Sequence, residues 1–175
     1  MTHTITREFL RLHGACYDDA KIATLIPPDG LPLVDVLNLD IPAADRIWVA
    51  TLPGACLPSI MWEWQARLVE RALARVEKPD PRSLAVVPLL RRLAIGEAIP
   101  QSERDAANAS AWDSAWATAS AAASAAASAS ARGSARASAS AASWARIASA
   151  SAADRDAEDN QQIADLIDLL TKVTP

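Results

Sequence analysis

The residues that could perform chemistry are few, and the clearest pair is a histidine and a cysteine near the N-terminus. His13 and Cys16 stand three positions apart, so one helical turn could place an imidazole base beside a thiol nucleophile. No third group that would orient the imidazole is identifiable, and a thiol flanked by Ala15 and Tyr17 is typical of a small packed residue. We therefore expect no catalytic residue, and the protein is not predicted to be an enzyme.

The same residue types are too sparse to bind a metal ion or a cofactor. His3 and His13 are the only histidines, whereas a tetrahedral metal site needs three or four ligands. The acidic spacing of Asp154, Asp156 and Glu158 partly matches a calcium-binding loop, but the glycine and the distal glutamate of that loop are absent. No glycine-rich phosphate loop or nucleophile elbow occurs. The sequence therefore predicts neither a metal site nor a cofactor site.

Tryptophan and charged side chains in the C-terminal half are the candidates for contacts with a partner. Three of the six tryptophans, Trp48, Trp62 and Trp64, stand in apolar helical contexts and are expected in the core. The other three stand among alanine and serine, where they either fasten helices together or form exposed anchors, since tryptophan and arginine dominate binding hot spots. The candidate partner contacts are Trp112, Trp116, Arg132, Arg136, Trp144, Arg146, Asp154, Asp156, Glu158 and Asp159.

Charge and composition exclude several classes of protein. The net charge of the chain is −4. Residues 154–175 have two basic and six acidic side chains, so this segment alone also has a net charge of −4. No basic stripe is present, so we expect no direct nucleic-acid binding. No uncharged apolar run is long enough to span a membrane, and the polar N-terminus does not resemble a signal peptide. Two cysteines far apart in the chain favour a reducing cytoplasm.

The first hundred residues predict short helices separated by proline and glycine. Gly14 and Gly96 are expected to end helices in the left-handed conformation, and Pro88 is expected to kink or split the helix that contains it. No alternating run of large apolar residues appears, so the fold class is all-α. The predicted helices cover residues 6–12, 17–25, 32–39, 42–52, 58–77 and 82–95.

A segment rich in alanine and serine follows. The chain has 40 alanines, of which 25 lie between residues 106 and 153 together with 12 serines. Alanine strongly favours helix, and serine alternating with alanine does not separate an apolar from a polar face, so a strand is not expected. A single helix of this length would extend about 75 Å, whereas a compact domain of this size has a radius of gyration of about 16 Å. We therefore place a turn at Gly133, between antiparallel helices near 103–131 and 135–153.

The last predicted helix, over residues 157–173, is amphipathic, with Ile163, Leu166, Ile167 and Leu170 on one face. The sequence as a whole predicts a single helical domain over residues 1–175. Within it, a short-helix N-terminal base (1–101) packs on a long Ala/Ser-rich antiparallel helical hairpin (102–153), and an acidic amphipathic helix (154–175) closes the fold.

The arrangement resembles the Ala-rich immunity proteins found in bacterial polymorphic-toxin loci and in bacteriophages. The resemblance spans residues 6–172 and includes a long Ala-rich helical stretch with aromatic residues, followed by a final amphipathic helix. The motifs that carry it are Phe9-Leu10 with His13-Gly14-Ala15-Cys16, the helix Asp45-Arg46-Ile47-Trp48-Val49-Ala50, the loop Glu77-Lys78-Pro79-Asp80-Pro81-Arg82, and the step Gly96-Glu97.

This resemblance implies a non-catalytic protein that binds and neutralises a macromolecule in the cytoplasm of a bacterial cell or a phage-infected host. The partner would be a protein, either a toxin or a host defence component. The acids of residues 154–159 could steer it toward a basic target. The alternative is a structural or assembly protein that forms a homo-oligomer through its Ala/Ser helices.

Overall fold

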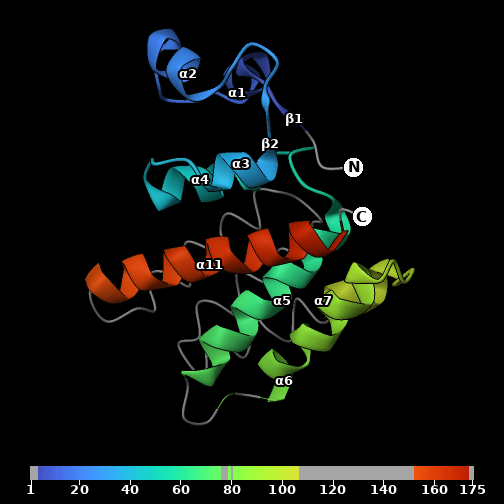
Figure 1. Cartoon of the computed structure of the whole chain (residues 1–175). Helices are drawn as coiled ribbons and strands as arrows, with labels where there is room; N and C mark the ends of the chain where they lie inside the picture. The colour runs from blue at the N-terminus through green and yellow to red at the C-terminus, as the bar shows by residue number, and fades with distance from the viewer. Residues whose placement is uncertain (1–3, 76–78, 80, 107–151, 174–175) are drawn as a thin grey trace.

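The computed structural model describes residues 4–75, 79, 81–106 and 152–173 (Figure 1). The described part is mostly helical, as expected. Residues 101–106 are helical at the predicted start of the hairpin, but the predicted turn at Gly133 and most of both hairpin helices lie outside the described residues. Every helix in the described part of the chain is too short or too polar to span a bilayer.

The first helix, α1 (Arg7–Leu12), begins and ends where local sequence signals place it. The Thr6 hydroxyl accepts a hydrogen bond from the Phe9 amide at 3.1 Å and caps the helix start. At the other end Gly14 has φ +75°, and the Ala15 amide donates to the Leu10 carbonyl oxygen at 3.0 Å. This pattern is a Schellman motif, so the predicted glycine stop is confirmed.

A two-stranded sheet departs from the all-α prediction. Strand β1 (Thr4–Ile5) pairs antiparallel with β2 (Leu31–Pro32), with Ile5 opposite Leu31. Each strand has only two residues, so no alternating apolar pattern could reveal them. The pairing needs Gly30, where φ is +79° and an added Cβ would come within 2.8 Å of the Ile5 carbonyl oxygen.

The remaining helices of the base are α2 (Asp19–Leu25), α3 (Leu33–Leu37), α4 (Ala43–Ala50), α5 (Pro58–Ala74), α6 (Pro81–Leu84) and α7 (Val86–Ala94). The predicted helix over 82–95 is split, as Pro88 suggested. The proline ring would clash with the carbonyl group of Leu84 in a continuous helix, and the break at Ala85 places Pro88 in the first turn of α7 instead. Gly96 ends α7 with φ +81°.

The C-terminal helix α11 (Ala152–Val173) crosses the middle of the molecule, with α3 and α4 on one side and α5 on the other (Figure 1). Its apolar face is confirmed: Ile163, Leu166 and Leu170 are buried among residues of the N-terminal base. The central contact is Trp64, which is fully buried and donates its indole N–H to the Gln162 carbonyl oxygen at 2.9 Å. Helix α5 therefore presents one face to α11.

The opposite face of α5 packs on α7. Ala66, Val69 and Leu73 form a second apolar cluster there with Val86, Val87 and Leu90. Of the three tryptophans predicted in the core, Trp64 is fully buried, whereas Trp48 and Trp62 are half-buried against the two clusters. The core prediction is thus confirmed for Trp64 and holds in part for the other two.

Candidate functional site

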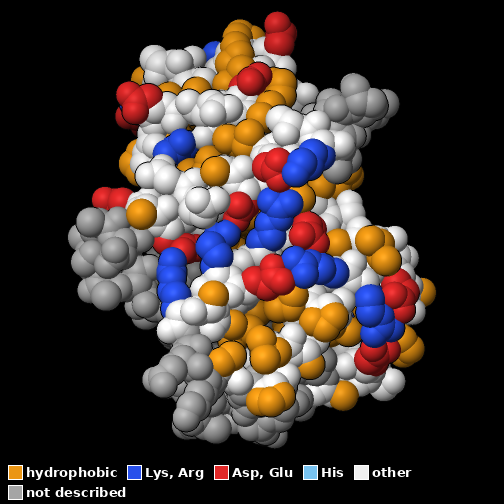
Figure 2. Space-filling model, turned by 60° about the horizontal axis from the view of Figure 1, so that its bottom comes forward, with side chains coloured by type: hydrophobic (Ala, Val, Ile, Leu, Met, Phe, Trp, Pro, Cys, Tyr) orange, Lys and Arg blue, Asp and Glu red, His pale blue; other side chains and the backbone are white. Residues whose placement is uncertain are grey.

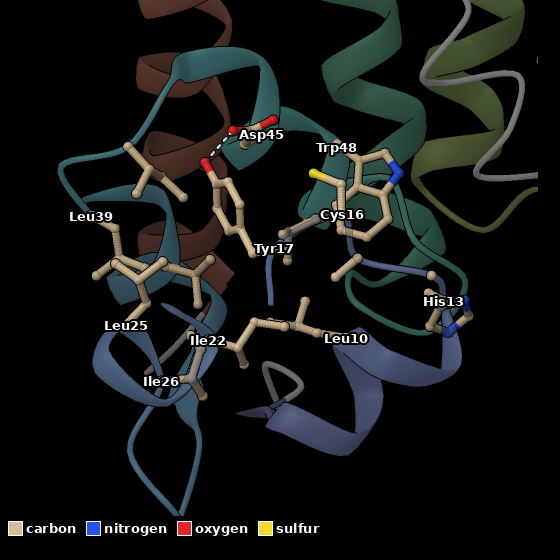
Figure 3. Close-up of a pocket in the computed structure, with 15 residues that line it drawn as sticks. Leu10, His13, Cys16, Tyr17, Ile22, Leu25, Ile26, Leu39, Asp45 and Trp48 are labelled. Carbon is tan, nitrogen blue, oxygen red and sulfur yellow. Dashed lines mark hydrogen bonds between the residues drawn. The ribbon is translucent and has the colours of Figure 1, made fainter. Parts of the chain in front are cut away.

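The clearest candidate site is an apolar pocket enclosed by α1, α2, α3 and α4. Its cavity has a volume of about 330 Å³. That volume lies at the low end of ligand-binding pockets, which suits one bulky side chain or a small molecule. Figure 3 shows the side chains around it, which come from four short elements rather than from one long helix.

The pocket is apolar inside and polar only at its rim. Its floor is formed by Leu10, Ile22, Ile26 and Val36, each of which is at most 7% exposed. Its polar lining groups belong to residues that reach solvent: Cys16 is exposed, and His13, Tyr17 and Asp45 are half-buried. An apolar group would therefore lie inside the cavity with any polar group it carries at the mouth.

Tyr17 and Asp45 form the polar edge of the pocket. The Tyr17 hydroxyl donates a hydrogen bond to Oδ2 of Asp45 at 2.5 Å, which links the start of α2 to the first turn of α4 (Figure 3). This hydrogen bond, together with burial and the carboxylate charge, raises the pKa of Tyr17 to about 12. The second carboxylate oxygen, Oδ1, accepts no further side-chain hydrogen bond within the described residues and is available to a donor.

Three arginines brace the pocket walls instead of pointing into the cavity. Arg7 donates from Nε to the Ile26 carbonyl oxygen at 2.7 Å, at the end of α2. Arg11 donates to the Tyr17 carbonyl oxygen at 2.8 Å, and Arg46 donates to the Leu37 carbonyl oxygen at 2.9 Å. The Ile26 and Leu37 carbonyl groups lie at the C-terminal ends of α2 and α3, where a helix leaves carbonyl groups unpaired, and the Tyr17 carbonyl group lies just before α2. The charged donors satisfy all three, so the walls are held before any ligand arrives. The sequence did not reveal these roles, because each bond joins an arginine to a backbone carbonyl group in a neighbouring element or loop and depends on how the short helices pack.

His13 and Cys16 both line the pocket, but they do not act as a pair. The His13 ring packs on the Phe9 ring, with centroids 4.6 Å apart, and its backbone forms the C-cap of α1. Figure 3 shows the imidazole well separated from the Cys16 sulfur. Within the described residues, no hydrogen bond connects the two side chains, and no cluster of three or more His, Cys, Asp or Glu residues could hold a metal ion.

Glu158 and Asp159, two of the predicted partner contacts, are each 3% exposed, so the structure buries them instead of presenting them to a partner. Glu158 faces α5, where its Oε1 lies 3.1 Å from Nη2 of Arg71 and its Oε2 lies 2.5 Å from Nη2 of Arg75. The pairing of Glu158 with the arginines of α5 exists only in the folded chain, because the two helices are distant in the sequence. Of the other predicted contacts, Asp156 is exposed, while the side chain of Asp154 is not described.

The Glu158 contacts belong to a longer series of ion pairs between α5 and α11. Arg71 also bonds Asp165, and Arg67 lies 3.0 Å from Asp168. Hydrogen bonds from Lys172 and Arg67 hold the pKa of Asp168 below its ordinary value. Figure 2 shows the basic and acidic side chains interleaved across this face. This series of ion pairs thus joins α11 to α5, and the face that carries it presents no uniform charge to a partner.

The remaining predicted contacts lie outside the described residues: Trp112, Trp116, Arg132, Arg136, Trp144 and Arg146.

A second hollow lies between α5, α6 and α7. Its lining includes Leu73, Val87 and Pro88, with Glu70 and Arg91 paired at 2.7 Å on its edge. This hollow is more open than the α1–α4 pocket. Its lining includes Pro79, whose chain neighbours 76–78 and 80 lie outside the described residues. The α1–α4 pocket is therefore the better-defined candidate.

No protein-family model, no curated protein and no solved structure matches this chain.

Proposed function

We propose that this protein is a non-catalytic binding protein that captures a partner protein and neutralises it. It would act as a toxin-immunity or phage counter-defence protein in the bacterial cytoplasm. The resemblance of residues 6–172 to Ala-rich immunity proteins supports this class of function. The observation that carries the proposal is the α1–α4 pocket, a cavity with a buried apolar floor and a polar rim.

Such a pocket suits a binding surface because interface hot spots consist of bulky anchors seated in desolvated pockets. The arginine bonds to the Ile26, Tyr17 and Leu37 carbonyl oxygens hold its walls in place. A preformed pocket lowers the ordering cost of association, which otherwise opposes binding. Leu12, which precedes the lining residue His13 in the chain, is 81% exposed and adds apolar surface for a partner.

Growth rescue tests the proposal. Each reading frame next to the gene for this chain is expressed alone in a bacterial host, and a frame that stops growth is then co-expressed with this protein. We expect rescue by the wild-type chain. An A15L variant, which enlarges a residue of the pocket lining, should lose rescue, whereas A20L, which makes the same change at an exposed position outside the lining, should keep it.

Two results would contradict the proposal. In one, A15L folds normally and rescues growth as well as A20L does, so the pocket is not the contact surface. In the other, the purified protein forms a stable higher oligomer across a concentration series and captures none of the neighbouring gene products. That second result would favour the assembly alternative.

A further inference from the structure

The chain segment that builds the pocket is acidic. Residues 7–46, which supply every lining residue except Trp48 and Val49, carry seven acidic and four basic side chains, a net charge of −3. Three of the four basic residues, Arg7, Arg11 and Arg46, are bound to backbone carbonyl oxygens, and Arg11 also pairs with Asp19. These bonds hold the arginine side chains against the walls, while the segment that builds the pocket keeps its net charge of −3.

One carboxylate stands at the rim, and a second lies next to lining residues in the chain. Asp45 lines the cavity and uses only Oδ2 to accept the Tyr17 hydrogen bond. Asp40 is exposed between two lining residues, Leu39 and Ile41. A cation held there would lie beside the mouth and not inside the cavity, so it would keep part of its hydration. The pocket therefore combines an apolar interior with an anionic edge.

We propose that the pocket receives an apolar side chain of the partner protein that is flanked in the partner's sequence by a lysine or arginine. This inference rests on the proposed function and specifies the chemistry of the partner. The apolar side chain enters between Leu10, Ile22 and Val36, and the basic group pairs with Asp45 at the rim. The opposite arrangement, a lysine tip inserted into the cavity, would bury an ammonium group against an apolar floor and is disfavoured.

Charge complementarity is the feature that selects this occupant over other apolar ones. An exposed ion pair contributes up to about 1 kcal/mol, which corresponds to about a fivefold change in affinity. The cavity volume of about 330 Å³ limits the inserted group to roughly one bulky side chain. The anchor residue should supply most of the affinity and the flanking basic residue most of the discrimination.

Short peptides test this chemistry without knowledge of the partner. Three acetylated and amidated tetrapeptides, Gly-Phe-Lys-Gly, Gly-Phe-Glu-Gly and Gly-Ala-Lys-Gly, are titrated into the full-length protein and followed by amide chemical shifts. We expect the Phe-Lys peptide to shift pocket resonances and to bind about three- to fivefold more tightly than the Phe-Glu peptide. The Ala-Lys peptide should cause no saturable shift.

Variants separate the two parts of the pocket. In D45N the amide oxygen can still accept the Tyr17 hydrogen bond, so the fold is retained while the rim charge is reduced. We expect D45N to bring the Phe-Lys and Phe-Glu affinities closer together. A15L should remove binding of both peptides, and A20L should leave binding unchanged.

Equal affinity for the Phe-Lys and Phe-Glu peptides in the wild type would overturn the proposal, as would shifts confined to residues outside the pocket. Tight binding of 2-phenylethylamine with no binding of the Phe-Lys peptide would also overturn it, because the occupant would then be a free small amine. Growth rescue is a separate measurement. Peptide binding without growth rescue would support the pocket chemistry and contradict the proposed function. Growth rescue without peptide binding would support the proposed function and contradict the pocket chemistry.

Discussion

The substitution E158Q tests whether the acidic end of α11 stabilises the fold or serves as a contact surface. The Glu158 side chain is 1% exposed and bonded to Arg71 and Arg75, with the Gln162 amide 3.3 Å from Oε1. Glutamine keeps the shape but removes the charge. We therefore expect a loss of stability with little change of structure.

The magnitude follows from the exposure of the three partners. Removing one member of a fully buried ion pair costs about 3–5 kcal/mol. Here the Arg71 and Arg75 side chains are 25% and 44% exposed, and Arg71 retains its pairing with Asp165. Both guanidinium groups can thus regain hydration, and we expect E158Q to lower the free energy of unfolding by about 2 kcal/mol.

Urea unfolding followed by tryptophan fluorescence measures this difference. The matched control is D156N, which removes a charge from an exposed position on the same helix and should change the free energy of unfolding by less than about 0.5 kcal/mol. If E158Q were as stable as D156N and only weakened partner binding, Glu158 would be a contact residue, and the assignment of the α5–α11 ion pairs as structural would be refuted.

Three further predictions concern local features. Tyr17 is the only tyrosine, so tyrosinate absorbance reports its pKa alone. We expect a titration midpoint near pH 12 in the folded protein and a lower midpoint in D45N. The pKa of Tyr17 in the folded protein is raised above the ordinary value of about 10. The Tyr17–Asp45 bond therefore stabilises the fold fully below pH 10, and this stabilisation is lost as the pH rises through 12. A midpoint near 10 in the folded wild type would contradict the Tyr17–Asp45 bond. Gly30→Ala should lower the free energy of unfolding in urea by about 2 kcal/mol or more, since strain at positive φ adds to a clash with β1. The control Gly54→Ala, at a residue with φ +85° and open space around it, should lower it by about 1 kcal/mol. Equal losses would count against the close approach of Gly30 to β1. Trp64→Phe leaves the Gln162 carbonyl without its indole donor and creates a small void. We therefore expect the free energy of unfolding, measured by heat or urea, to fall by about 2–3 kcal/mol. A fall of less than about 1 kcal/mol would exclude this hydrogen bond as a main link between α5 and α11.

Helix boundaries were largely predictable because their causes are local. A threonine at the start of a helix accepts a hydrogen bond from an amide three residues later, and a glycine ends a helix just after its last turn. Both effects involve only a few neighbouring residues. The stops at Gly14 and Gly96 and the break before Pro88 follow from such signals. The apolar face of α11 was predictable for the same reason, since its period is a property of one helix.

The candidate site was not predictable to the same extent. Single residues of the pocket, such as His13 and Cys16, drew attention as possible chemistry, yet the pocket itself depends on four helices that meet in space. The acids near the start of α11 were predicted to contact a partner, because a carboxylate is usually exposed unless a basic residue pairs with it. Arg71 and Arg75 supply those partners for Glu158 from more than eighty residues away in the chain.

By itself, the sequence determined a mostly helical chain, its main breaks and the apolar stripe of its last helix, because propensity, capping and periodicity act over one or two turns. Only the tertiary structure decided that Glu158 is buried, that Gly30 must be small for β1 to pair with β2, and that α1–α4 enclose an apolar cavity with Asp45 at its edge. Those outcomes depend on which surfaces meet. A carboxylate becomes structural, and a group of short helices becomes a binding pocket, only through neighbours that are distant in the chain.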